Sequence, residues 1–405
     1  MLSKMSLLIS ISAVLFLGMA VVSLHPQPKF ALDDYEESGV CRNCHDTRID
    51  LTSQWRSSML SQAWVDPLFQ FSYRQAGEDT GGKTDNFCPR CHTPVGYLTG
   101  NLPPRADLGK EGISCDFCHT IANSTGIGNG AYVSSPSKIK RAQYPDARST
   151  HHETAYSDLH TRSEFCGMCH DVFDPENPGL MEQATYTEWK ESSYPKRGIQ
   201  CQHCMMNTVS GVVGASEAVM GPHQWVVFEH RFLGGHWEEN LKKAALLFLE
   251  IDKSEVRGGD RVGVKVQLAN VGCGHALPTG RSDLRELWLE VKAVDFAGHE
   301  VFSGRRVYGT GFADADGHAV GHRFWLAKRV LNDYRILPEE VKTETFNFAV
   351  PEKAEGPITL EAKLLYRLAP QEYADAAEVE TLPIIMMKDA KTEIIVSKEE
   401  RTKHP

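Results

Sequence analysis

Residues 87–120 read FCPRCHTPVGYLTGNLPPRADLGKEGISCDFCHT and contain one pattern twice: two cysteines separated by two residues, with a histidine directly after the second cysteine. The two copies are Cys88–His92 and Cys115–His119. The pattern recurs on either side, as CRNCH at Cys41–His45 and CGMCH at Cys166–His170. In chain order these are the first to fourth motifs. Their spacing is that of covalent c-type haem attachment.

Haem attachment gives each position of the pattern a chemical role. The two thiols add to the two vinyl groups of one haem, and the adjacent histidine then lies under the iron as its proximal ligand. The predicted thioether cysteines are Cys41, Cys44, Cys88, Cys91, Cys115, Cys118, Cys166 and Cys169. The predicted proximal ligands are His45, His92, His119 and His170. Because few residues separate the second motif from the third, we expect their haems to lie close together.

Zinc binding and disulfide bonds are the other common uses of paired cysteines. Zinc ribbons do not need a histidine after each second cysteine, so four repeats of that detail argue against zinc. A secreted disulfide framework would scatter its cysteines more widely, whereas ten of these eleven fall in Cys-x-x-Cys pairs. Cys273 is left over, and we expect it to be buried as a small apolar side chain.

The fifth pair, Cys201 and Cys204, departs from the pattern because Met205 stands in the place of the histidine and His203 lies between the cysteines. Three outcomes compete: a fifth haem with Met205 or another residue as ligand, a disulfide in an oxidising compartment, or free thiols. Methionine is a known haem ligand that raises the reduction potential. The attachment machinery is expected to recognise the histidine, so haem and disulfide both stay open for this pair.

Electron-transfer haems have protein ligands at both axial positions, so four motifs call for four more ligands. Seventeen histidines minus the four proximal ones leave thirteen candidates. Clustering around the motifs favours His152, His160, His230 and His236, and less strongly His151 and His223. His275 lies in NVGCGHALPTG, where a tight loop presents it to a haem or it is a simple turn residue. Surface roles are expected for His299, His318 and His322.

The charge of the chain bears on its partners. The formal net charge is −10, which argues against a nucleic-acid partner because such a partner calls for clustered lysine and arginine. Haem propionates would make the surface more acidic still. We therefore expect redox partner proteins that are basic or neutral, and no DNA or RNA.

The N-terminus has the layout of an export signal. Lys4 is followed by an apolar run from Leu7 to Val22, so residues 1–31 are predicted to be a signal peptide or an N-terminal anchor. The run is short for a transmembrane span, which needs about 20 apolar residues. Cleavage and retention both stay open, and a membrane is reached only through an uncleaved segment or a partner complex. Export to the periplasm, or to the extracellular space or cell surface, is expected.

Two regions differ in their residue patterns. Residues 32–240, the haem region, are rich in glycine, proline and polar residues, so the haems are expected to supply its core around short helices such as Thr185–Ser193. Residues 241–405, the β region, open with a helical or strand-leading segment at Asn240–Glu250. Apolar and polar residues then alternate in Arg261–Asn270, Glu286–Val294, HEVFSGRRVYG, TETFNFAV, ITLEAKLLYRL and TEIIVSKE.

About seven such runs predict an antiparallel β-sandwich of immunoglobulin-like type. The fold class is therefore α+β multidomain. A mostly α or irregular multihaem domain is followed by an all-β sandwich, and the boundary is predicted near residue 240.

Words flanking the motifs carry a family resemblance. FCPRCHTPVG, GISCDFCHT, SEFCGMCHDV, TYTEWKESSYPKRGIQCQHC, HRFLGGH and NVGCGHALPTG, in this order, resemble the tetrahaem-type cytochromes c related to the electron carriers of nitrifying bacteria. They are also similar to subunits of extracellular cytochrome filaments. The resemblance implies haems with two histidine ligands, stacked in alternating parallel and perpendicular pairs. The family usually has histidine where Met205 stands, which puts the fifth haem specifically in question.

These observations favour electron transfer by an exported cytochrome with four haem c groups, and a fifth at Cys201 and Cys204 as an open alternative. The competing hypothesis is a multihaem redox enzyme acting on a small nitrogen or sulfur compound, for which one iron would need an open position. A third hypothesis refines the first: self-association into filaments, in which a histidine of one chain ligates an iron of the next.

Overall fold

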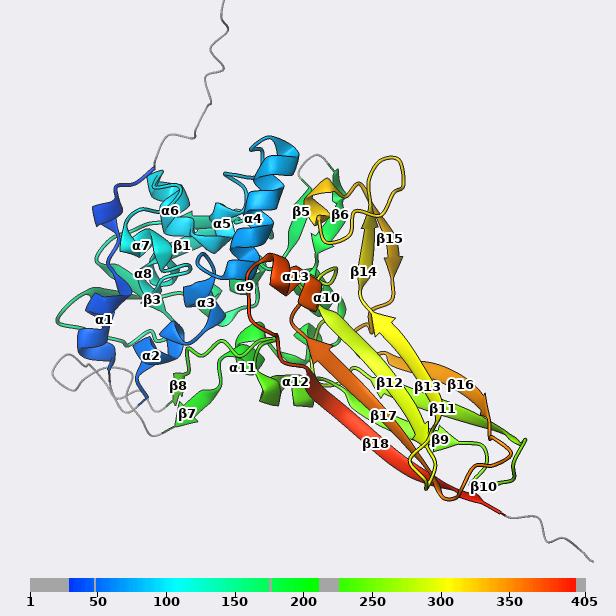
Figure 1. Cartoon of the computed structure of the whole chain (residues 1–405). Helices are drawn as coiled ribbons and strands as arrows, with labels where there is room; N and C mark the ends of the chain where they lie inside the picture. Colours follow the sequence, from blue (N-terminus) through cyan, green and yellow to red (C-terminus); the bar gives the residue numbers. More distant parts are fainter. Residues whose placement is uncertain (1–28, 47–48, 175–176, 211–225, 398–405) are drawn as a thin grey trace, which may run out of the picture.

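The structure is a computed structural model that describes residues 29–46, 49–174, 177–210 and 226–397. Nearly all of the predicted leader at residues 1–31, and the weaker ligand candidate His223, lie outside these described residues. Within the described ranges, no helix has the length and hydropathy needed to cross a membrane. Figure 1 shows the haem region as a group of short elements beside the long strands of the β region.

Short helices and two-stranded ribbons make up the haem region. The helices are α1 (Ser38–His45), α2 (Leu51–Arg56), α3 (Met59–Gln62), α4 (Pro67–Thr80), α5 (Pro89–His92), α6 (Pro94–Thr99), α7 (Asp107–Lys110), α8 (Cys115–Thr120), α9 (Glu164–Gly167), α10 (Thr185–Glu191) and α11 (Cys201–Met205). The ribbons pair β1 (Ile121–Ser124) with β2 (Tyr132–Ser134), β3 (Ile139–Ala142) with β4 (Glu153–Tyr156), β5 (Val172–Asp174) with β6 (Asn177–Gln183), and β7 (Thr208–Ser210) with β8 (Val226–Phe228). The predicted helix near residues 185–193 is confirmed, whereas the sequence analysis did not predict these ribbons.

Local signals in the sequence set the ends of these helices. Asp66 accepts a hydrogen bond from the backbone N–H of Phe69 and stands before Pro67, which begins α4. Gly81 ends α4 with a φ of 61°, a left-handed conformation that glycine adopts without steric cost. At α8, the Ser114 hydroxyl accepts the N–H of Phe117 and so begins the helix that carries the third motif.

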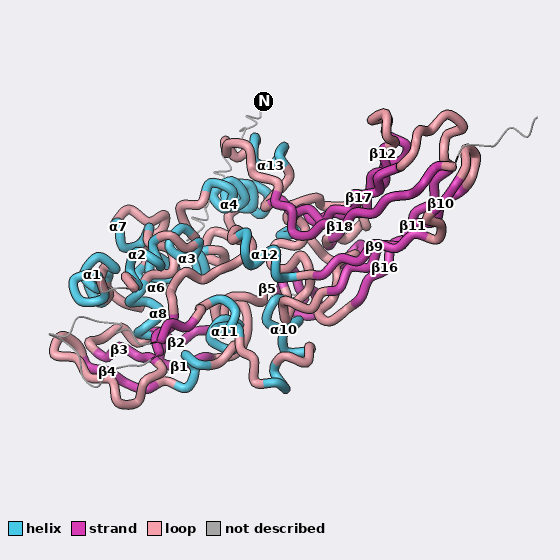
Figure 2. The backbone as a smooth tube through the Cα atoms, turned by 90° about the horizontal axis from the view of Figure 1, so that it is seen from below, coloured by secondary structure: helices cyan, strands magenta, loops and turns pink. Residues whose placement is uncertain are grey.

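Two sheets form the β region (Figure 2). One sheet has the strand order β10 (Glu255–Val256), β18 (Ile385–Val396), β17 (Ile358–Arg367), β12 (Glu286–Val294) and β13 (Glu300–Tyr308). The other has the order β16 (Val341–Ala349), β11 (Arg261–Ala269) and β9 (Leu246–Ile251). Alternate residues of β11 and β12 point into one apolar core that both sheets share. A multistranded β fold in this region is therefore confirmed, while the immunoglobulin-like type stays a prediction.

Two features of the β region differ from the expectation, and a third agrees with it. The short strand β10 pairs in parallel with the end of β18, with Glu255 opposite Ile395 and Val256 opposite Val396. Strands β14 (Thr310–Ala313) and β15 (Arg329–Asp333) form a separate hairpin that packs on the haem region instead of joining either sheet. The segment at 240–250 forms both alternatives in turn, since α12 (Glu238–Ala244) leads into β9.

The two regions are joined by packed contacts. Leu68 of α4 is buried against Tyr373 of α13 (Gln371–Ala376). Phe312 of β14 packs on Leu180 of β6, and Figure 1 shows this hairpin beside β5 and β6. Between α10 and the β region, the guanidinium of Arg335 pairs with the buried carboxylate of Glu188. The β region therefore forms part of the wall around the haem region.

Replacing Arg335 with alanine should destabilise this junction by about 3 kcal/mol, the low end of the cost of leaving a buried charge unpaired. The Glu188 side chain is 8% exposed and would keep only its bonds from the Ala276 N–H and the Thr279 hydroxyl. Lys242→Ala is the control, because its pair with Glu238 is exposed and contributes about 0.3–0.5 kcal/mol. Urea unfolding of the haem-loaded protein measures the free energy of unfolding of both variants. An equal loss in the two variants would contradict a buried ion pair at the junction.

Candidate functional site

One connected cavity of about 1770 Å³ occupies the haem region and reaches the β region. All ten paired cysteines and the four motif histidines line it. The other predicted ligands that line it are His152, His160, His230, His236, His275 and Met205. Ordinary ligand pockets measure about 300–1,000 Å³. The cavity therefore fits several haem macrocycles together, and it brings every predicted site residue to one place.

Thiol contacts across the cavity link motifs that are distant along the chain. The thiols of the first and third motifs, of the second and fourth, and of the fourth motif and the fifth pair lie near one another: Cys41 near Cys115, Cys91 near Cys169, and Cys166 near Cys201. The neighbouring thiol and then burial raise the pKa of Cys166 and of Cys169, and both are close enough to Cys118 of the third motif for its charge to matter. The fourth motif therefore lies at the centre of the group.

The proximal histidines are oriented by backbone carbonyls. His92 Nδ1 lies 2.8 Å from the Ala63 oxygen, and His119 Nδ1 lies 2.8 Å from the Arg141 oxygen. A carbonyl oxygen only accepts, so Nδ1 carries the proton and Nε2 keeps its lone pair for a metal. Burial lowers the pKa of His92 to about 4, and it also lowers the pKa of His119 and of His170. These imidazoles are therefore neutral near pH 7, the form that ligates iron.

Most of the predicted distal histidines share this arrangement. Nδ1 lies 3.0 Å from a backbone carbonyl in each of His152, His230 and His275. His160 differs, because its Nδ1 bonds to the Ser157 hydroxyl at 2.8 Å and its Nε2 lies 3.0 Å from the Cys118 carbonyl. Burial lowers the pKa of His160 and of His230 to about 4. The first three histidines thus present Nε2 as a metal ligand would, whereas His160 must exchange a hydrogen bond to do so.

Ring positions divide the candidate ligands into two groups. The His119 ring centroid is 6.0 Å from that of His160 and 6.2 Å from that of His230. Two imidazoles that hold one metal from opposite sides, through bonds of about 2 Å, have centroids about 6 Å apart. His45 and His152 are also within electrostatic range of His119. The first and third motifs therefore share His152, His160 and His230 as candidate partners.

The second group surrounds the second and fourth motifs. Besides burial, the nearby His275 lowers the pKa of His170. His236 has its pKa lowered by burial and by Arg285, while Asp66 acts in the opposite direction. Asp66 lies three residues from Ala63, whose carbonyl holds His92. His275 is therefore the candidate partner of the fourth motif, and His236 lines the same cavity as a candidate ligand.

Helix α11 presents the fifth pair to the cavity. Its last residue, Met205, and His203 both line the cavity, and the Nδ1 of His203 accepts the N–H of Gln200 at 2.8 Å. That acceptor role places the proton of a neutral His203 on Nε2 and so argues against ligation through Nε2. Cys273 is half-buried at the edge of the β core, where its thiol donates to the Asn270 side-chain oxygen at 3.0 Å.

Two serines that no sequence pattern had singled out, Ser38 and Ser163, hold the motifs against one another. Ser38 and Ser163 are fully buried, and the hydroxyl of each accepts a cysteine N–H from another part of the chain. A signal for them was present in the sequence, since each stands three residues before the first cysteine of a motif, in SGVC and SEFC. Serine side chains usually bond to backbone groups close by in the sequence. A bond to a distant cysteine N–H therefore becomes evident only in the folded chain.

Charged groups also line the cavity wall near the β region. Arg281 is paired with Asp283 through two hydrogen bonds of 2.8 Å and lies over the Phe324 ring at 4.4 Å. Glu182 of β6 is 7% exposed, and burial raises its pKa to about 8, with the negative charge of Asp174 acting in the same direction. The sequence alone did not single out these residues, because their roles depend on the docking of the two regions.

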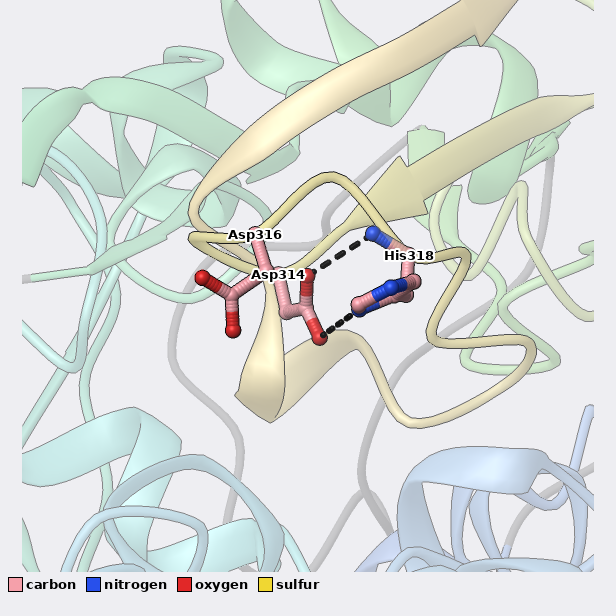
Figure 3. Close-up of side chains that lie close together, drawn as sticks. All are labelled: Asp314, Asp316 and His318. Atoms are coloured by element: carbon pink, nitrogen blue, oxygen red, sulfur yellow. Dashed lines mark hydrogen bonds and ion pairs between the residues drawn. The ribbon is translucent and has the colours of Figure 1, made fainter.

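Outside the cavity, Asp314, Asp316 and His318 gather in the loop between β14 and β15 (Figure 3). The His318 N–H donates to the Asp314 carboxylate at 2.8 Å, and this backbone bond holds the pKa of Asp314 below its usual range. The bonds between Asp314 and His318 close a turn of the loop, and this turn explains why the three side chains lie near one another. The cluster is therefore not assigned to a metal, and the exposed His318 fits the surface role predicted for it.

Comparison with known proteins finds a family model that matches part of the chain. Residues 40–120, which contain the first three motifs, match the family described as cytochrome c554 and c-prime. No curated protein sequence matches the chain.

The fold is similar to that of a penta-heme cytochrome c552 from Thermochromatium tepidum, with a TM-score of 0.69 and 22% identity over 90% of this chain and 100% of that chain. At this identity the likeness shows the fold alone. Two other solved structures each align with 38% of this chain: Spo0M from Bacillus subtilis (12% identity, 50% of that chain, TM-score 0.19) and the CARDB domain of PF1109 from Pyrococcus furiosus (14%, 90%, 0.20). TM-scores of 0.19 and 0.20 do not indicate a shared fold.

Proposed function

The family match and the shared fold support a multihaem cytochrome c family for this chain, and from that premise we propose that it is an exported electron carrier with four haems ligated by two histidines each. One observation supports this most strongly. The eight motif cysteines, their four histidines and five further predicted histidines line a single cavity, and most of those with described bonds keep Nε2 available.

In this proposal the chain holds and orients haem c. Bound haem supplies the one-electron chemistry of its iron. The four motifs bind through thioethers, while Nδ1–carbonyl bonds at His92, His119, His230 and His275 fix the direction of each Nε2. The cavity walls exclude bulk water, which lowers the local dielectric and stabilises neutral imidazoles. The residues thereby set ligation and potential.

We assign axial pairs from the two groups of histidines. His170 and His275 would hold one iron, and His236 is the candidate that would serve His92. The first and third motifs draw on the other group, in which the bond of His230 Nδ1 to the Phe228 carbonyl directs its Nε2 to a metal. The thiol contacts suggest an electron path that runs from the first motif to the third, then to the fourth, and from there to the second.

Location and partners follow from the same proposal. The leader-like residues 1–31 support export, with the mature protein in the periplasm or at the cell surface. The net charge of −10 supports a basic or neutral redox partner. Filament formation by self-association is a refinement that electron microscopy of secreted material tests, since a monodisperse monomer at high concentration would contradict it.

A second candidate function rests on Met205, because a motif without its histidine is where an iron with an open position could arise. Such a haem would suit a redox enzyme acting on a small nitrogen or sulfur compound. Electron transfer is favoured because predicted ligands surround each complete motif.

The test is to purify the mature protein, reduce it, and record visible spectra before and after adding carbon monoxide. We expect the four histidine-ligated haems to give no carbon monoxide shift, since both axial positions are filled. We also expect rapid, reversible reduction by a small redox mediator. A shift involving several haems, together with turnover of nitrite, hydroxylamine or sulfite, would replace the carrier with an enzyme.

A further inference from the structure

We propose that Cys201 and Cys204 attach a fifth haem and that Met205 is its proximal iron ligand. The inference deepens the proposed function, because it assumes that the complete motifs bind haem. It is carried by a packing arrangement that occurs twice, once around a complete motif and once around the fifth pair.

The first copy joins the third motif to the first. Ser38 stands three residues before Cys41, and its hydroxyl accepts the backbone N–H of Cys115 at 3.2 Å. The Ser38 hydroxyl in turn donates to the Glu111 carboxylate at 2.8 Å, which also accepts the Ser38 N–H at 3.2 Å. The Cys41 and Cys115 thiols lie close together. In this position α8 directs Cys118 and His119 into the cavity.

The second copy joins the fifth pair to the fourth motif with the same connections. Ser163 stands three residues before Cys166, and its hydroxyl accepts the backbone N–H of Cys201 at 2.9 Å. The Ser163 hydroxyl and N–H both bond to the Gln200 side-chain oxygen at 2.8 Å. The Cys166 and Cys201 thiols lie close together. The serine, the supporting side-chain oxygen and the thiol contact thus all have counterparts in the first copy.

The repeated arrangement gives Met205 the position of a proximal ligand. Helix α11 begins at Cys201 and ends at Met205, just as α8 begins at Cys115 and carries His119 at its fifth residue. Cys204 and Met205 line the same cavity as Cys118 and His119. The thioether of methionine is a haem ligand that raises the potential relative to histidine. The Nδ1 of His203 already accepts a hydrogen bond, which leaves the proton of the neutral ring on Nε2, so His203 does not compete for the iron.

The attachment chemistry balances without an oxidant. Each thiol adds across one vinyl double bond: the sulfur bonds to the carbon next to the ring, and the thiol hydrogen ends on the terminal carbon. No electrons leave the system. A disulfide between the same two cysteines would instead release two electrons and two protons, so intact mass separates the two outcomes directly.

The experiment uses the full chain matured in a host that attaches haem c, and it combines intact mass with spectra of the oxidised protein. We expect a mass for five haems and a sulfur-to-iron charge-transfer band. Met205→Leu should keep five haems, lose that band and make one haem reactive to carbon monoxide. Met205→His should keep five haems, lose the band and lower one reduction potential. Met206→Leu is the matched control, because Met206 also lines the cavity but follows the end of α11.

A mass for four haems with Cys201 and Cys204 oxidised would overturn the fifth attachment. Five haems with a spectrum that Met205→Leu leaves unchanged would overturn the ligand assignment. If Met205→Leu fails to fold, Met205→His still tests the ligand, because it restores the complete pattern. Failure of the electron-carrier proposal would look different, since it would change the carbon monoxide reactivity of the histidine-ligated haems without altering the haem count.

Discussion

Without haem attachment, the haem region at residues 32–240 should lose its fold while the β region at 241–405 stays folded. The physical reason is the size of the cavity. At about 24 cal/mol for each Å³ of empty core, a cavity of about 1770 Å³ would cost about 40 kcal/mol. A whole domain is stable by only about 5–15 kcal/mol. The walls of the cavity therefore cannot persist around empty space, and the macrocycles must act as their core.

Hydrogen exchange followed by mass spectrometry measures this on protein made with and without the haem attachment machinery. In the haem-free chain we expect α4 and α8 to exchange rapidly and β11, β12 and β17 to stay protected. Much of the β core lies away from the cavity, because residues such as Leu289 and Leu364 are fully buried between the sheets and do not line it. A haem-free chain with α8 still protected would show that protein contacts alone hold the haem region.

Changing His275 to alanine should convert one haem from six-coordinate to five-coordinate without changing the haem count. His275 is the predicted partner of His170, and its Nδ1 is held by the Ala276 carbonyl so that Nε2 is available to iron. Alanine offers no ligand, so one reduced haem should become high-spin and bind carbon monoxide. Its reduction potential should also move by a substantial part of the roughly 0.8 V that axial ligands span.

His322→Ala is the matched control for this experiment. His322 also bonds through Nδ1 to a backbone carbonyl, that of Asp283 at 2.7 Å, and it packs against Tyr373 with ring centroids 5.6 Å apart. It is not among the residues that line the cavity. We expect its removal to leave the spectrum unchanged. If both variants or neither bind carbon monoxide, His275 is not a specific ligand.

Local sequence patterns predicted some strands of the β region and missed others. The alternation in Arg261–Ala269 and Glu286–Val294 predicted two central strands correctly, because a strand with one buried face must alternate. The hairpin β14–β15 was missed because much of its apolar surface, such as Val330 and Leu331, is exposed. The parallel pairing of β10 was missed because two residues carry no pattern of their own.

Haem attachment could be predicted without the fold, since thiol spacing and the adjacent histidine are local features within five residues of one another. The same patterns predicted that all the candidate ligands would serve one cofactor type. The groups that lie near one another became known from the folded chain: the first motif with the third, the fourth with the fifth pair, and His275 of the β region with His170. These contacts join residues far apart along the chain, so packing around the shared cavity specifies them and no local pattern can.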